Sequence, residues 1–311
     1  MSHGFGVTEA LQSLPDVVYL LFALLTQLGD LWFYVLALTL AYAYAESLLD
    51  DDALGRGRVA VVVALALGAL ALTAGLKELF AHARPPSAGS LRPIPWLPGS
   101  LVPLFEGFAT ADGYSLPSGH ATGSAAVYGG AALLLRYGRD RVRYLLAAAV
   151  VTVVAASRVI IGVHFLGDVL VGVVAGFGYA LVVYWATDEG DQVKRAFSIA
   201  LAVALVAAAV HFSVDTMSAL GGALGGRIGW TVFGDRAALG TVTREEGTLT
   251  AAIALPLGGL FIGLAFVIDT PVAGFVGNAL ALAAILGAPL AARRVLDGRQ
   301  PEPSLGDAGD D

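Results

Sequence analysis

Residues 57–79 read GRVAVVVALALGALALTAGLKEL, an apolar block that ends in a lysine and a glutamate. A helix of this length is about 35 Å long, enough to cross the hydrocarbon core of a membrane. Similar blocks recur along the chain, and only 14% of its residues are charged. A soluble two-domain protein is the alternative, and the number of such blocks argues against it. The sequence therefore predicts an all-α, polytopic transmembrane helix bundle.

Eight helices are expected in this bundle. The first six would form a core over residues 29–213, and the last two a hairpin within an additional membrane region, residues 214–296. Residues 80–118 and 214–250 are rich in glycine, the first also in proline, and predict two long connections. The expected helices cover residues 29–46, 57–79, 119–137, 142–160, 165–186, 196–213, 251–268 and 273–292.

The two ends of the chain differ from the rest. Residues 1–28 are apolar but broken by Pro15 and Asp16, which predicts an interfacial or re-entrant segment, or alternatively a further span. The first residues lack a basic region and a cleavage site, so no removable signal peptide is expected. The acidic tail, residues 297–311, is expected to be disordered.

The composition excludes several kinds of function. The chain has no cysteine, which excludes disulfides, thiol catalysis and cysteine metal sites. No basic stripe with interleaved aromatic residues is present, so nucleic-acid binding is not expected. The net charge is −7, and only two residues are lysines. This acidic, lysine-poor composition indicates a salt-adapted prokaryote, with high-GC codon bias as the alternative.

Three polar segments interrupt the apolar chain. They are Lys77-x6-Arg84-Pro85, Pro117-Ser118-Gly119-His120 and Ser157-Arg158-x5-His164-x3-Asp168. Polar groups at membrane depth are costly, so each segment is a functional candidate. The first ends the second helix, the second begins the third, and the last joins the fourth helix to the fifth. Because ends of even-numbered helices and starts of odd-numbered ones lie on one side, all three segments meet at one membrane face.

The cations of these segments predict a phosphate-binding site. Lys77 and Arg84 would share one helical face if the second helix continues that far. Guanidinium groups such as that of Arg158 match phosphate oxygens in pairs. The helix start at Ser118 and Gly119 offers free N–H groups to an anion, and glycine lets the backbone approach closely.

Two histidines supply the reactive groups. His164 and Asp168 are four residues apart on one helical face, and a carboxylate on one ring nitrogen makes the other more nucleophilic. We expect His164 to attack phosphorus, and His120 to protonate the leaving oxygen and later activate water. The cations would stabilise charge on the transferring group. No metal or other cofactor is expected, because the nearby carboxylates lack ligand spacing.

The three segments resemble the signature of the type-2 phosphatidic-acid phosphatase superfamily, Lys-x6-Arg-Pro, Pro-Ser-Gly-His and Ser-Arg-x5-His-x3-Asp. Every fixed position is met in order. The resemblance covers roughly residues 29–186. It implies metal-independent hydrolysis of a lipid-linked phosphate monoester or diphosphate, phosphatidic-acid-like or polyprenyl, through a phosphohistidine. By motif position it implies phosphate binding by Lys77, Arg84, Ser118, Gly119 and Arg158, and catalysis by His164, His120 and Asp168.

Two other classes of function stay open beside the lipid phosphatase. A vanadate-dependent haloperoxidase shares this anion site in the wider superfamily, although such enzymes are typically soluble. A non-catalytic lipid-binding or transport protein could keep the same fold, but the intact nucleophile and acid argue against it. Three further features are given no functional role: His82, His211 and the Glu245-Glu246 pair, which is expected to be solvated.

The distribution of basic residues predicts which side the site faces. Loops opposite the motifs hold eight of them, whereas three of the four on the motif side belong to the motifs themselves. The positive-inside rule then places the active site on the extracytoplasmic side. Simple helix counting puts Arg293, Arg294 and Arg299 outside as well, against the rule. The eight are Arg56, Arg58, Arg136, Arg139, Arg141, Arg143, Lys194 and Arg195.

Overall fold

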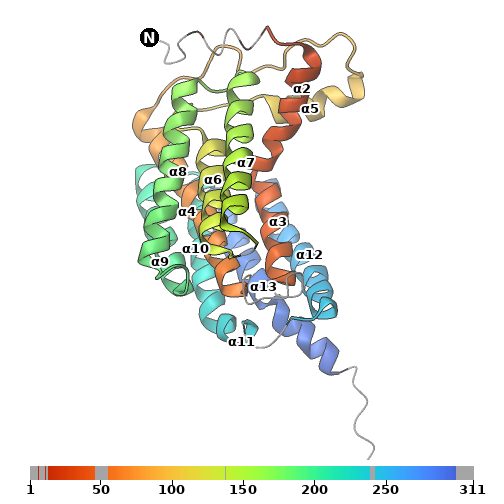
Figure 1. The fold of residues 1–311 in the computed structure, drawn as a ribbon, viewed down its shortest axis with the longest axis vertical. Helices are drawn as coiled ribbons and strands as arrows, with labels where there is room; N and C mark the ends of the chain where they lie inside the picture. The colour runs from red at the N-terminus through yellow and green to blue at the C-terminus, as the bar shows by residue number, and fades with distance from the viewer. Residues whose placement is uncertain are drawn as a thin grey trace, which may run out of the picture.

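The computed structural model describes residues 6, 11, 13–45, 55–136, 138–238 and 242–298. Every regular element in those ranges is helical, and the long helices run along one axis (Figure 1). Six of the helices found there are long and apolar enough to cross a membrane. The prediction of an all-helical, multi-pass membrane bundle is therefore confirmed. The six are α4 (Arg56–Phe80), α7 (Asp140–Ile160), α8 (Leu166–Ala186), α9 (Val193–Val210), α12 (Arg244–Ile268) and α13 (Pro271–Asp297).

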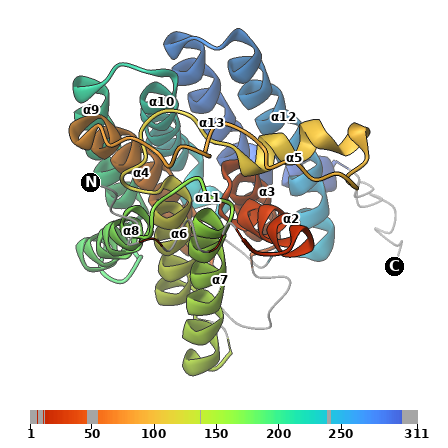
Figure 2. The ribbon, with the colours of Figure 1, turned by 90° about the horizontal axis from the view of Figure 1, so that it is seen from above.

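The remaining elements are shorter. They are α2 (Asp16–Leu25), η1 (Thr26–Gly29), α3 (Leu31–Tyr44), η3 (Gly99–Leu101), α5 (Val102–Ala109), α6 (Gly119–Leu134), α10 (Val214–Gly229), η4 (Trp230–Gly234) and α11 (Asp235–Ala237). The connection over residues 80–118 thus contains η3 and the short helix α5, which lies across the end of the bundle (Figure 2).

The N-terminal elements form a bent pair. α2 and η1 meet α3 at an angle of 51°. The break lies at Asp30, whose carboxylate accepts a hydrogen bond from the backbone N–H of Trp32 and so caps α3. α3 alone is about 21 Å long, shorter than the roughly 30 Å hydrocarbon core. The pair together is long and apolar enough to form either one broken span or a re-entrant loop, so the interfacial or re-entrant segment stays a prediction.

α4 is buried on most of its surface, and α6, α9 and α10 pack around it. A helix that is apolar on every side is expected at the centre of such a bundle. The helix ends at Phe80, and Ala81 follows in a left-handed conformation with φ of 46°. Lys77 therefore lies in the last turn of α4, whereas Arg84 lies in the following loop. The condition for a shared helical face is therefore not met, because the helix ends between them, close to the expected end at residue 79.

Small residues bring α6 and α8 into close contact at the motif end of the bundle. A Cβ atom on Gly176 of α8 would lie 2.1 Å from the carbonyl oxygen of Thr122 on α6. The backbone N–H of Ser118, just before α6, donates to the carbonyl of Asp168 on α8 at 3.0 Å. This close packing joins the second and third motifs directly.

The expected long connection over residues 214–250 is wrong, because most of it is helical. α10 continues through η4 and α11 to residue 237. Its glycines explain both the low hydropathy that hid it and its packing against α13. Cβ atoms on Gly221 and Gly225 would lie 2.0 and 2.2 Å from the carbonyl oxygens of Phe275 and Ala279.

This additional helix reverses the direction of everything that follows it. Arg293, near the end of α13, donates to Glu246 at 3.0 Å, and Glu246 also pairs with Arg56 at 2.9 Å. The end of α13 therefore lies beside the start of α4, at the face opposite the motifs (Figure 1). The simple helix count that places Arg293 on the motif side is therefore wrong, and so is the expectation of a solvated Glu246. Arg299 lies outside the described residues.

Candidate active site

The three motifs meet around a cavity of about 230 Å³ at one end of the bundle. It lies between the end of α4, the start of α6, the α7–α8 turn and the connection over residues 80–118. Asp30, at the α2–α3 break, completes its wall. The predicted site residues that line the cavity are Lys77, Arg84, Gly119, His120, Arg158 and His164. The other two, Ser118 and Asp168, are buried outside its lining.

The cavity holds three cations that form no close ion pair in the described ranges, although the carboxylate of Asp30 also lines its wall. In the described part of the chain, neither Lys77, Arg84 nor Arg158 has a carboxylate oxygen within 4 Å. Arg158 is only 4% exposed, and one of its terminal nitrogens donates to Thr26 Oγ1 at 3.0 Å. Its Nε has no hydrogen-bond partner among the described residues. Buried cations without counter-ions favour an anionic ligand.

Arg84 reaches the cavity from the loop after α4 and is held by two carbonyl groups. Its Nε donates to Asp112 O and its Nη1 to Val163 O, both at 2.9 Å. Nη1 also lies 3.0 Å from Nε2 of His164. Since an arginine N–H can only donate, this ring nitrogen carries a lone pair, and the ring proton of neutral His164 is on Nδ1.

The other ring nitrogen of His164 faces a polar pair behind the cavity. Ser115 Oγ lies 3.2 Å from Nδ1 and donates to Oδ2 of Asp168. Asp168 itself is 3.6 Å from Nδ1, too far for a good direct hydrogen bond. The same carboxylate oxygen accepts the backbone N–H of Phe165 at 2.8 Å. Asp168 therefore holds the imidazole mainly through the Ser115 hydroxyl, rather than directly as expected.

Burial lowers the pKa of two cavity residues that lie outside the membrane helices, His164 and Arg84. It lowers the pKa of His164 to about 3, against the opposing interaction with Asp168 and with help from the charges of Arg158, Arg84 and Lys77. Burial also lowers the pKa of Arg84, and the carboxylates of Asp168 and Asp112 oppose that change. His164 is therefore neutral at neutral pH, with a lone pair on Nε2.

His120 lies in the first turn of α6 and lines the same cavity. Its Nε2 is buried without a hydrogen-bond partner in the described ranges, and Asp30 Oδ2 is 3.7 Å away. Gly119 also lines the cavity, and a Cβ atom there would come within 3.3 Å of Thr73 Cγ2. Ser118 does not offer its backbone N–H to the cavity, because that group already donates to Asp168 O.

Three residues near the motifs escaped the sequence analysis. Asp30 is close to His120, Ser115 links His164 to Asp168, and Thr26 holds Arg158. Ser115 lies only two residues before Pro117, so its closeness to the second motif was the available signal. Thr26 and Asp30 are far from every motif in sequence, and only the bend between α2 and α3 places them beside Arg158 and His120.

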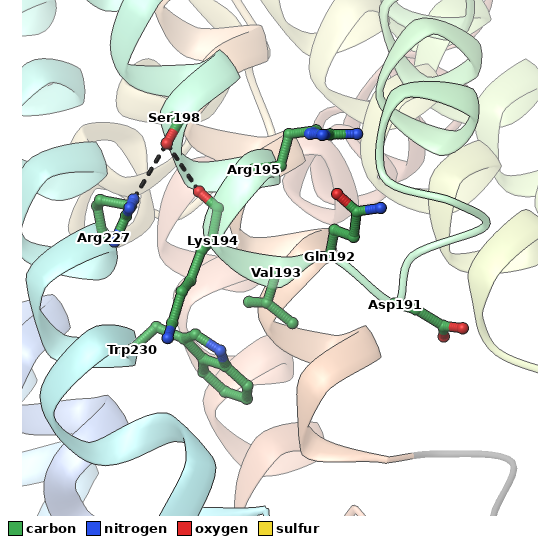
Figure 3. Close-up of a pocket in the computed structure, with 8 residues that line it drawn as sticks. All are labelled: Asp191, Gln192, Val193, Lys194, Arg195, Ser198, Arg227 and Trp230. Atoms are coloured by element: carbon green, nitrogen blue, oxygen red, sulfur yellow. Dashed lines mark hydrogen bonds between the residues drawn. The ribbon is translucent and has the colours of Figure 1, made fainter.

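The carboxylates and histidines of the described residues include no group of three or more that could hold a metal ion. A larger cavity, about 620 Å³, lies at the opposite face between the start of α9 and the end of α10 (Figure 3). Ser198 there accepts a hydrogen bond from Arg227 Nε at 3.0 Å and donates to Lys194 O at 2.8 Å. This cavity contains none of the motif residues, so it is not the candidate active site.

Comparison with known proteins agrees with the motifs. The family model of the PAP2 superfamily matches residues 58–190, a range that contains all three motifs. No curated protein and no solved structure matches the chain. The resemblance inferred from the motifs is confirmed for this range.

Proposed function

We propose, from the premise that residues 58–190 form a PAP2 superfamily domain, that this protein is a lipid phosphatase using a histidine nucleophile. Membership of that superfamily implies phosphatase-type activity on phosphate monoesters. The observation that carries the finer proposal is the cavity where two imidazoles lie among three cations that have no carboxylate within 4 Å among the described residues. The site lies at the end of membrane helices, where a lipid can present its phosphate while its tail stays in the bilayer.

The first chemical step transfers the phosphoryl group to His164. The substrate phosphate takes the hydrogen bond that Arg84 otherwise makes to Nε2, and Lys77 and Arg158 bind its other oxygens. Nε2 then forms a bond to phosphorus while the bond from phosphorus to the alcohol oxygen breaks. His120 gives its proton to that oxygen. Negative charge on the transferring group stays beside the three cations throughout.

The second step restores the enzyme. Water attacks the phosphohistidine, the N–P bond breaks, and His120 takes the proton from that water. Inorganic phosphate leaves, and the electron pair of the broken N–P bond stays on Nε2. In both steps Ser115 and Asp168 keep the ring proton of His164 on Nδ1 and favour the imidazolium-like charge of the phosphorylated ring.

The proposal includes the surroundings of the site. Residues 29–213 form the catalytic core, and residues 214–296 form an additional membrane region. With the end of α13 now at the same face as the basic loops, the basic residues near the described end of the chain agree with the positive-inside rule. The active site would then face the extracytoplasmic side of the cell membrane.

Phosphate release by the purified protein tests the activity. A panel of phosphatidic acid, phosphatidylglycerol phosphate, a polyprenyl diphosphate and a soluble sugar phosphate would be assayed in EDTA. We expect release from at least one lipid with the chelator present. Activity that disappears on chelation would reject the metal-independent mechanism.

Trapping the intermediate separates the roles of the two histidines. With substrate labelled in the phosphate, His120→Ala should accumulate an acid-labile phosphoenzyme, because its hydrolysis lacks a base. His164→Ala should accumulate none. Labelling of His164→Ala but not of His120→Ala would show that the two roles are reversed.

A further inference from the structure

A second cavity, about 290 Å³, adjoins the catalytic one. The two share Asp30, Lys77, Gly119 and His120, whereas His164 lines only the catalytic cavity. The second cavity extends away from the motifs between α3, α4 and α6. His120 therefore lies between the two cavities, and the second one is on the side away from the nucleophile.

An apolar groove in the membrane part of the bundle adjoins the second cavity. Leu31, Tyr34, Ala66 and Leu70 line both spaces. The groove runs on between α3, α4, α12 and α13, and it is narrow, with a volume of about 60 Å³. Its far wall belongs to α12 and α13, outside the PAP2 domain, and consists of Ile262, Asn278, Leu282, Ile285 and Leu286.

The geometry of phosphoryl transfer indicates which part of the substrate would occupy the second cavity and the groove. The attacking and leaving groups lie roughly in line on opposite sides of phosphorus. If His164 attacks and His120 protonates the leaving oxygen, the alcohol must extend on the side of His120. The second cavity is the space next to His120 on that side, and the groove adjoins it toward the middle of the bundle.

Two buried hydroxyl groups at this junction support a ligand there. Tyr34 and Thr73 both line the second cavity and are each 6% exposed. Neither hydroxyl has a hydrogen-bond partner in the described part of the chain. A buried polar group without a partner is costly, and a ligand oxygen near the phosphate would relieve that cost.

We propose that this groove binds the hydrocarbon chain of the alcohol released by the reaction, with α12 and α13 forming its far wall. The inference rests on the proposed phosphatase function and gives the region over residues 214–296 a role in substrate choice. A lipid tail gains little by leaving the bilayer for an equally apolar groove. The groove therefore acts by holding the ester oxygen in line with His164 and beside His120.

A pair of tryptophan substitutions on α4 tests the groove. Leu70 lines the groove, whereas Leu72 faces a separate space between α4 and α9, so Leu70→Trp and Leu72→Trp form a matched pair. Each full-length variant would be assayed in detergent micelles with dioleoyl and with dihexanoyl phosphatidic acid. We expect Leu70→Trp to lower kcat/KM for the long-chain substrate at least tenfold relative to the short-chain one. Leu72→Trp should keep the wild-type ratio.

A second pair on α13 keeps the test independent of one substitution. Leu282→Trp places a bulky side chain in the far wall of the groove and should fill it. Leu280→Trp places the same side chain at an exposed position of the same helix. Only Leu282→Trp should change the chain-length ratio. Wild-type ratios in both Leu70→Trp and Leu282→Trp, in active and folded protein, would overturn the groove while leaving the phosphatase function intact. Wild-type protein that releases phosphate from neither of these lipids nor from any other lipid of the panel would instead overturn the function on which the inference rests.

Discussion

Arginines are buried at both ends of this bundle, but their surroundings are opposite. At the face away from the motifs, Arg56 is fully buried and pairs with Glu246, and its donors also reach the carbonyls of Tyr42 and Ala237. Arg293 shares the same carboxylate. At the motif end, Arg158 is also buried, but it has a single neutral side-chain partner, Thr26, and no carboxylate within 4 Å in the described ranges.

The difference separates structural charge from functional charge. A buried ion pair whose donors are satisfied can join helices, and the Arg56 network joins α3 and α4 to α11, α12 and α13. A buried cation without a counter-ion costs free energy unless a ligand supplies the charge. Sequence composition treats both arginines alike, and only their partners distinguish them. Five measurements would show whether the charges at the two ends differ in this way.

The largest expected effect is the loss of turnover in His164→Ala. Removing the nucleophile should lower kcat by at least about a thousandfold, because no other group can form the covalent intermediate. Phosphate release measures the loss, and the thermal unfolding curve in detergent should change little. A variant that keeps near wild-type activity would mean that the cations at this end serve binding alone.

Glu246→Ala should produce the largest loss of stability. It leaves Arg56 buried without a counter-ion, which should lower the free energy of unfolding by about 3–5 kcal/mol. Glu245→Ala is the matched control, because the adjacent side chain is exposed and should change stability by about 0.5 kcal/mol or less. Thermal unfolding measures both. Equal effects of the two would show that the network contributes nothing particular.

Arg158→Met should lower activity without lowering stability, the reverse of what is expected for Glu246→Ala. Losing one donor to the transferring phosphate should lower kcat/KM by about a hundred- to a thousandfold. The free energy of unfolding should stay level or rise, since the substitution removes a buried cation that has no carboxylate partner. A stability loss as large as that of Glu246→Ala would remove the distinction between the two ends.

Ser115→Ala tests the link between His164 and Asp168. Loss of a hydrogen bond worth on the order of 1 kcal/mol should lower kcat roughly fivefold. Ser87→Ala, another serine of the same connection, which donates to Gly162 O, is the control. If Ser115→Ala retains full kcat, Asp168 must orient the imidazole without the hydroxyl.

The smallest expected effect is that of acid on His164, whose ring should stay neutral when the pH is lowered to 5. Its pKa is lowered by burial from 6.5 to about 3, so the folded protein should keep this ring neutral at pH 5, where an exposed histidine is protonated. Ring-nitrogen NMR of histidine-labelled protein measures the charge, with His164→Asn assigning the signal. A His164 signal that titrates near pH 6.5 would show that the site does not exclude the proton.

Much of the architecture was accessible from the sequence. The apolar blocks located α3, α4, α6 to α9, α12 and α13 to within a few residues, apart from the first turns of α12 and the last turn of α13. The alternation of helix directions was enough to predict that Lys77, His120 and His164 meet at one face. These three residues line a common cavity. They lie at or next to helix ends, and the direction of each helix fixes the membrane face at which its end lies.

What the sequence did not predict depends on contacts between distant segments. α10 was missed because it packs through glycines such as Gly221 and Gly225, and glycine carries little of the hydropathy that marks a span. Glu246 looked like a solvated charge because its partners, Arg56 and Arg293, are 190 and 47 residues away. Asp30 has no sequence relation to His120 and reaches it only through the bend before α3.

The two ends of the described chain emerge at opposite faces. Asp16, at the start of α2, pairs with Arg92 of the connection over residues 80–118, whereas Arg293, near the end of α13, shares Glu246 with Arg56. The start of α2 and the end of α13 lie at opposite ends of the bundle (Figure 1). A tag on either terminus therefore reports sidedness directly, without any enzyme assay. In sealed cells, a membrane-impermeant protease that removes an N-terminal epitope while sparing a C-terminal one would establish that the phosphate pocket opens to the outside.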